Sequence, residues 1–118
     1  MTQEERLKLI VQALDSKKAE NITVIGIRDL TILADYFVIA DGSSTTQVKA
    51  LADEVEFRMK RDAGLDTVPG VNSNSNLWTI LDYGDIAVHV FHKEQREFYN
   101  LERLWQDGKE IDISQWLK

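Results

Sequence analysis

The stretch from residue 77 to residue 91 constrains the fold most, because it joins two strand-like segments through a tight turn. Both segments are rich in β-branched and aromatic residues. They meet at Tyr83-Gly84, where glycine can adopt the positive φ of a two-residue hairpin turn. With these two residues as the loop, Asp82 lies opposite Asp85. The pattern therefore predicts a β-hairpin with a defined register.

Alternation along this hairpin sorts its side chains onto two faces. In the expected register Trp78 lies opposite His89, on the same face as Phe91 and the two aspartates. The other face is aliphatic apart from Thr79, and we expect it to be the core side. The aromatic face has two interpretations. It is either an open protein-docking patch or a second buried layer that the N-terminal helix or the C-terminal segment covers.

Hydrophobic spacing predicts the elements that precede the hairpin. Apolar residues at i, i+3, i+4 and i+7 indicate an amphipathic helix over residues 3–19. Residues 22–27 and 36–40 are typical of strands in one sheet, and the second is nearly continuously apolar, as in a buried strand. Ser44 and Gln47 have capping-box spacing, so a second helix is expected to begin there.

The second helix is expected to end near Gly64, a usual residue after a helix C-terminus. Residues 65–70 are interpreted as a short strand, and residues 72–76 as a polar loop. Helical spacing returns over residues 94–107. Residues 109–118 are too apolar for a free tail and are expected to dock on the domain.

This order of elements predicts an α/β chain of the α+β kind, with a mixed β-sheet of about five strands and helices packed against it. A length of 118 residues fits one hydrophobic core. We therefore expect a single domain over residues 1–108 and a C-terminal extension over residues 109–118.

The charge balance narrows the class of partner. The chain has 14 basic and 20 acidic residues, a net charge of −6. An acidic chain is poorly suited to neutralising phosphates, so little direct nucleic-acid binding is expected. It can instead dock on a basic protein, where complementary potentials speed encounter.

Composition also bears on compartment. The sequence has no cysteine, which excludes disulfides and thiolate catalysis and fits a reducing compartment. No apolar run approaches the length that spans a bilayer, and the N-terminus is not signal-like. We expect a cytoplasmic protein with no membrane association.

Catalytic and metal sites are weakly supported. His89 and His92 fall on opposite faces of one strand, so they do not form a pair. Asp82 and Asp85 could bind Mg²⁺ as paired carboxylates, but aspartates beside a Tyr-Gly turn are ordinary turn chemistry. We therefore predict no catalytic residue, no metal and no cofactor.

One enzyme hypothesis remains as the alternative. Gly42-Ser43-Ser44 precedes a helix, and such a turn can hold a phosphate on its N–H groups. Nucleotidyltransferases add an acidic pair on a strand. Here Glu54 and Glu56 have the local spacing but lie on a predicted helix, which directs their carboxylates about 200° apart. The alternative function is a small Mg-dependent nucleotide-binding or nucleotidyltransferase-like enzyme.

Several motifs in order resemble the ribosomal silencing factor family, RsfS, also called Iojap-like. The motifs that carry the resemblance are Ala34 to Ala40 with Gly42-Ser43-Ser44, Trp78 with Asp82 to Asp85, Val88 to Phe91, and Arg96 to Tyr99. The resemblance covers residues from about 3 to 107. It implies an α/β domain of nucleotidyltransferase-like topology without that activity, usually a homodimer.

The resemblance also implies a function. Members of this family bind the large ribosomal subunit through its protein numbered fourteen, block joining of the small subunit sterically, and so repress translation. We therefore expect a non-enzymatic repressor whose partner is a basic ribosomal protein. The expected partner-binding residues are Trp78, Asp82, Tyr83, Asp85, His89, Phe91, Arg96 and Tyr99.

Overall fold

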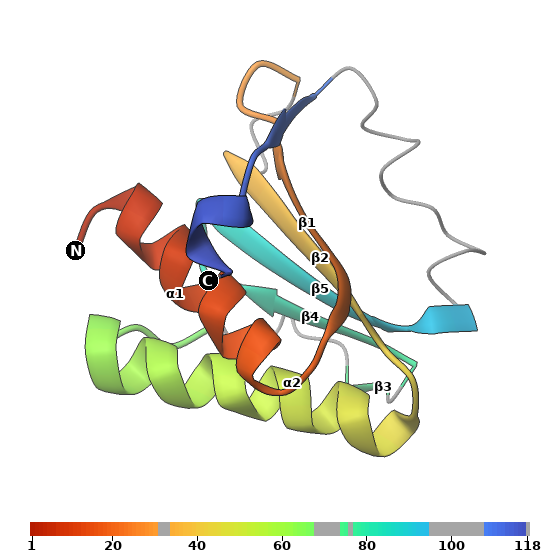
Figure 1. The fold of residues 1–118 in the computed structure, drawn as a ribbon. Coiled ribbons are helices and arrows are strands. Elements are labelled where there is room, and N and C mark those ends of the chain that lie inside the picture. Colours follow the sequence, from red (N-terminus) through yellow and green to blue (C-terminus); the bar gives the residue numbers. More distant parts are fainter. Residues whose placement is uncertain (31–33, 68–73, 76, 95–107, 118) are drawn as a thin grey trace.

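One mixed β-sheet organises the computed structural model of this chain (Figure 1), which describes residues 1–30, 34–67, 74–75, 77–94 and 108–117. Within these ranges six strands lie in the order β3-β4-β5-β2-β1-β6. β2 and β5 run parallel, and the other neighbours are antiparallel. The strands are β1 (Glu20–Gly26), β2 (Tyr36–Gly42), β3 (Asn74–Ser75), β4 (Trp78–Asp82), β5 (Ile86–His92) and β6 (Lys109–Ile111).

Two helices, α1 (Gln3–Ser16) and α2 (Thr45–Arg58), lie together on one face of the sheet (Figure 1). α2 begins as its cap predicts, because the Ser44 hydroxyl accepts a hydrogen bond from the Gln47 N–H at 3.1 Å. It continues into a π-helical turn, η1 (Met59–Ala63), and ends at Gly64 with φ of +66°. The α+β class and the mixed sheet expected from the sequence are confirmed.

The main core fills the space between the helices and the sheet. The aliphatic face of the hairpin points into it as expected: Leu81, Ile86, Val88 and Val90 are all fully buried. Amphipathic spacing of α1 supplies the facing side chains, among them Leu7, Ile10, Val11 and Leu14.

The C-terminal residues belong to the same core. β6 pairs with β1 at the edge of the sheet, and a 3₁₀ turn, η2 (Ser114–Trp116), follows it. Ile113 and Trp116 are buried in the main core. The Gln12 side chain of α1 donates a hydrogen bond to the Trp116 carbonyl at 3.3 Å.

The hairpin register differs from the expected one by two residues. Trp78 is opposite Phe91, not His89, and Asp82 is opposite Ala87. The Tyr83 N–H bonds the Ile86 carbonyl at 2.9 Å, which leaves Gly84 and Asp85 as the turn. A shift of two preserves the parity of every side chain, so the assignment of residues to faces is unchanged.

The strand and loop expected between residues 65 and 76 differ from the structure, and the helix expected over residues 94–107 cannot be compared with it. Residues 65–67 are not a strand, and β3 instead lies within residues 72–76, for which the sequence predicts a loop. The helix expected over residues 94–107 falls almost wholly outside the described residues. Arg96 and Tyr99 lie there too.

Candidate functional site

A cluster of aromatic side chains occupies the sheet face opposite α1 and α2. Trp78 of β4 and Phe91 of β5 are directly paired, and their rings stack with centroids 5.1 Å apart. Phe37 of β2 meets the His89 ring edge-on at 4.6 Å. Alternation along three neighbouring strands therefore gathers four rings on one face.

His89 lies at the centre of this cluster as a neutral side chain. The Trp78 indole N–H donates a hydrogen bond to His89 Nδ1 at 3.2 Å, so the ring proton resides on Nε2. Nε2 is buried and has no hydrogen-bond partner within the described residues. Burial lowers the pKa of His89 to about 4, so the ring is uncharged near neutral pH.

Of the two interpretations of the aromatic face, the open docking patch does not hold for two residues expected to contact the partner. Phe91 is fully buried, and His89 is only 6 % exposed. They belong to a second apolar cluster with side chains of β1 and β2 such as Ile25 and Ile39. Trp78 is partly buried at the margin of that cluster.

The second buried layer is therefore the correct interpretation for His89 and Phe91. One sequence signal pointed to it: residues 36–40 are almost continuously apolar, which is typical of a strand covered on both faces. The N-terminal helix is not the cover, because α1 packs on the other side of the sheet. Phe37, which belongs to that apolar run, was missed as a member of the cluster.

The two aspartates of the turn have separate structural roles. Asp82 accepts a hydrogen bond from the Gly84 N–H at 2.7 Å, the local turn chemistry favoured from the sequence. Asp85 instead accepts two hydrogen bonds from Arg6 of α1, at 2.8 and 2.7 Å. These bonds hold the pKa of the Asp85 carboxyl below its usual value.

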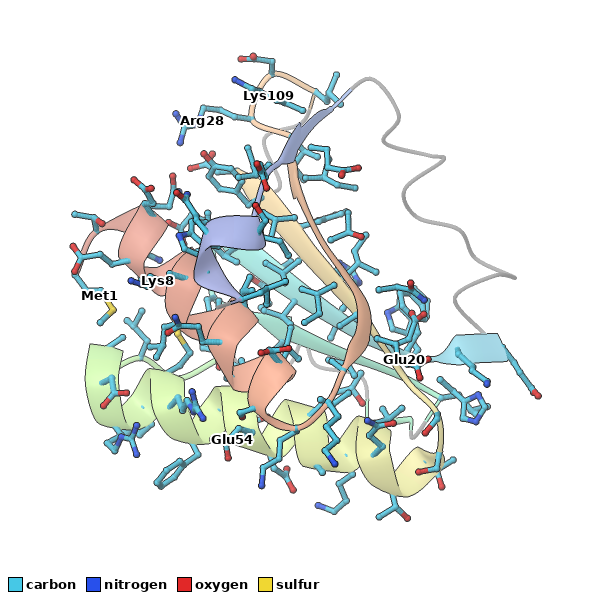
Figure 2. The ribbon with its side chains drawn as sticks, viewed as in Figure 1. Met1, Lys8, Glu20, Arg28, Glu54 and Lys109 are labelled. Carbon is cyan, nitrogen blue, oxygen red and sulfur yellow. The ribbon has the colours of Figure 1, made fainter. Side chains whose placement is uncertain are left out.

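Asp85 also joins a wider polar network at this end of the sheet. The Gln3 amide donates to both Asp85 and Asp35 at 2.9 Å. Arg28, labelled in Figure 2, donates to the Gln3 side-chain oxygen at 2.9 Å. The backbone N–H of Asp35 bonds the Asp85 carbonyl at 2.7 Å. Asp85 therefore ties the turn to α1 and β2, and this role was not foreseen.

Tyr83 lies apart from the aromatic cluster. Its side chain packs against the main core on the helix side of the sheet, whereas Trp78 lies on the opposite face. The expected contact residues therefore do not form one surface. Some lie on the aromatic face, Tyr83 lies on the helix side, and the two aspartates lie at the turn between β4 and β5. Within the described residues, no group of three or more potential metal ligands is found.

The turn before α2 is occupied by its own side chains. Gln47 accepts hydrogen bonds from the Ser43 N–H at 2.6 Å and from the Ser43 hydroxyl at 2.8 Å. A Cβ on Gly42 would lie 2.9 Å from Val48, so the backbone here packs tightly on α2. The N–H group that a phosphate would need at Ser43 is therefore already engaged.

The acidic pair of the enzyme hypothesis lies on a helix, as predicted. Figure 2 shows Glu54 on α2. Its carboxylate accepts a hydrogen bond from Arg58 at 2.7 Å, one helical turn later. Glu56 instead lines a separate groove. The two carboxylates do not converge, and a nucleotidyltransferase-like metal site is not formed by them.

No helix in the described part of the chain is long and apolar enough to cross a bilayer.

Comparison with known proteins identifies the family of this chain. The family model described as "Ribosomal silencing factor during starvation", RsfS, matches residues 1–118.

Individual relatives agree with this match. The chain is 36% identical over 113 residues to the ribosomal silencing factor RsfS of Halalkalibacterium halodurans, covering 96% of each chain. It is 37% identical to RsfS of Bacillus subtilis, covering 96% of this chain and 95% of that one.

A solved structure has the same fold. A crystal structure of a Chromobacterium violaceum protein superposes with a TM-score of 0.84 at 35% identity, covering 97% of this chain and 93% of that one. The family that these matches define consists of ribosomal silencing factors and not of enzymes. The chain belongs to the RsfS family, which includes Iojap.

Proposed function

We propose that this protein is a translational repressor that binds the large ribosomal subunit and prevents the small subunit from joining. Its contact on the subunit is the basic protein numbered fourteen, and it acts by occupying the joining face. The observation that carries the proposal is the match to the RsfS family over residues 1–118. No cofactor and no catalytic step are required for a repressor that acts by occupancy.

Electrostatics support a protein partner over bare RNA. The net charge of −6 opposes binding that depends on neutralising phosphates. A basic ribosomal protein offers the complementary potential, which raises the rate of encounter and sets orientation.

We place the docking surface along β4, where the edge of the aromatic cluster is accessible to a partner. Trp78 and Ile80 share the aromatic face and are partly exposed. Leu77 directly precedes β4, has the opposite parity, and is 42% exposed at the end of the strand. His89 and Phe91 are buried, so in this proposal they hold the Trp78 ring in place and do not contact the partner themselves. Aromatic anchors of this kind dominate the binding energy of protein interfaces.

The other expected contact residues take supporting roles. Asp82, Tyr83 and Asp85 shape and fix the turn that follows β4. Arg96 and Tyr99 remain predicted flanking contacts. The homodimer implied by the family resemblance and the cytoplasmic location expected from composition are also part of the proposal. Light scattering of the purified protein tests the dimer.

A sedimentation experiment tests the function. Purified protein is added to separated subunits before they are allowed to join, and the mixture is resolved on a sucrose gradient. We expect the protein in large-subunit fractions, its absence from whole ribosomes, and fewer whole ribosomes. Unchanged formation of whole ribosomes with the protein in excess contradicts the proposal.

A matched pair of variants tests the docking surface. Leu77→Ser and Leu117→Ser each remove one exposed leucine, 42% and 38% exposed respectively. Only Leu77→Ser is expected to weaken co-sedimentation with the large subunit. Equal effects of the two variants contradict the position assigned to the surface.

A further inference from the structure

A groove on the helix side of the molecule lies outside the proposed docking surface. It has a volume of about 430 Å³, within the range of small ligand sites. α2 and η1 form one wall, residues 65–67 continue it, and the Tyr83 side chain reaches it from the hairpin turn. The turn and α2 are thus brought together around a concave surface.

The Tyr83 hydroxyl gives this groove an unused polar group. Its oxygen is buried and has no hydrogen-bond partner within the described residues. Burial raises the pKa of the Tyr83 phenol, and the charges of Glu56 and Asp66 raise it further. The hydroxyl therefore stays protonated. Its oxygen keeps a lone pair that no described residue uses, and a donor in the groove reaches it only when the side chains that cover it shift.

The charges around the groove leave one carboxylate unpaired. Lys60 pairs with Asp66 at 2.9 Å, and Lys49 pairs with Asp53 at 3.2 Å. Glu56 forms no ion pair within the described residues. Burial raises the pKa of Glu56, and the negative charge of Asp53 adds to the effect. A cation placed here would relieve that repulsion.

The groove also presents an apolar wall. The Phe57 ring is 56% exposed, although large apolar side chains are usually covered. The guanidinium of Arg61 already lies over this ring, with its carbon 5.0 Å from the centroid. Arg61 is held there by Asp62, whose carboxylate it bonds at 2.8 and 2.9 Å.

We propose that the groove between α2, η1 and Tyr83 binds an arginine side chain of the basic ribosomal partner. In this site Glu56 accepts hydrogen bonds from the guanidinium, the Tyr83 oxygen accepts another, and Phe57 covers the aliphatic stem. The inference rests on the proposed function for its partner. It adds a second contact, on the opposite side of the sheet from Trp78.

The chemistry favours a guanidinium over other occupants. The groove cations Lys60 and Arg61 are each paired with an aspartate, so an anion would face the unpaired charge of Glu56 and be repelled. Arginine has five N–H donors in a planar fork, which can reach a carboxylate and a hydroxyl together. Its weaker hydration, compared with that of lysine, lowers the cost of entering a partly buried site.

A titration with N-acetyl-L-arginine amide tests the groove alone. We expect saturable NMR shifts at Glu56, Phe57 and Tyr83, and none with the neutral citrulline analogue. Glu56→Gln should weaken binding about tenfold, because the charged acceptor is lost. Asp15→Asn, an exposed site on α1, changes net charge equally and should have no effect. Equal shifts with citrulline, or undiminished binding by Glu56→Gln, overturn the proposal.

A second measurement places the groove in the ribosomal complex. Tyr83→Phe removes only the hydroxyl oxygen, and the variant should fold normally because that oxygen has no bond to lose. We expect Glu56→Gln and Tyr83→Phe to bind large subunits several-fold more weakly than Asp15→Asn. Equal binding by all three overturns the inference and leaves the proposed function standing. If the unmodified protein does not bind large subunits, the proposed function fails, and this second contact fails with it.

Discussion

Arg6 and Asp85 are 79 residues apart in the sequence, yet two hydrogen bonds of 2.8 and 2.7 Å join them. The pair fastens the first turn of α1 to the turn between β4 and β5. Both side chains are mostly covered, with 17% and 29% exposure. An ion pair in this setting contributes more to stability than an exposed one.

Asp85→Asn is expected to destabilise the fold by about 1–3 kcal/mol at pH 7, because a charged acceptor of Arg6 is lost. The lowered pKa of Asp85 sets the pH window. Its contribution is complete above the unfolded value of about 3.9 and is lost as pH falls through the lower folded value. Urea unfolding at pH 7 and at pH 3 measures the difference between variant and unmodified protein.

That difference should shrink at pH 3, because the unfolded state has by then bound most of its proton while the folded state, with its lower pKa, resists protonation. Asp15→Asn serves as the control, since it neutralises an exposed carboxylate without such bonds. An equal loss of stability in both variants at pH 7 would show that net charge, and not the bond to Arg6, is responsible.

His89 predicts a second pH window at higher values. Its folded pKa is about 4, against about 6.5 in the unfolded chain. Between these values only the unfolded state binds the proton, so stability falls as pH falls from 7 to 4. The loss reaches roughly 3 kcal/mol at pH 4 and is absent above pH 7. Urea midpoints at pH 7, 6, 5 and 4 measure it.

The His89→Leu variant isolates this effect because leucine is similar in size and cannot titrate. Its stability should change less between pH 7 and pH 4 than that of the unmodified protein. Parallel pH profiles for the two proteins would mean that His89 is accessible to protons in the folded state.

Trp78 has a structural role, which stability measurements test, and a proposed role as partner contact, which binding measurements test. Trp78→Phe keeps a ring against Phe91 but removes the donor to His89, so we expect a cost of about 1–2 kcal/mol. Trp78→Ala should cost about 2–4 kcal/mol, because a partly buried ring is removed. Thermal melts and co-sedimentation with large subunits are compared. Full ribosome binding by a folded Trp78→Ala protein contradicts its role as the anchor.

The hairpin shows which structural features local sequence pattern can predict: it predicts the face of each side chain but not the register of the two strands. Side-chain alternation assigned Trp78, His89 and Phe91 to one face correctly, because parity survives a register shift of two. The register itself was missed because Gly84 can occupy either position of a two-residue turn. Turn chemistry alone does not choose between these alternatives.

Contacts between residues that are distant in the sequence could not be predicted from local sequence pattern. Local sequence predicts only a turn role for Asp85, because nothing near it in the sequence indicates that Arg6 lies beside it. The burial of His89 depends on neighbours from β1 and β2, whose alignment with β5 is a property of the whole sheet. The apolar run at 36–40 indicated a covered strand but not which strands flank it.

The C-terminal residues provide the last prediction. Trp116 is 7% exposed and packs in the main core, so Trp116→Ala should cost about 3 kcal/mol. For a chain of this length, that corresponds to a melting temperature lower by about 10 °C or more. Leu117→Ala, at an exposed neighbour, is the control and should melt within about 2 °C of the unmodified protein. Removal of residues 109–118 takes β6 away as well, so it should cost more than Trp116→Ala. If the shortened protein melts at the original temperature, these residues contribute nothing to the core that they enter.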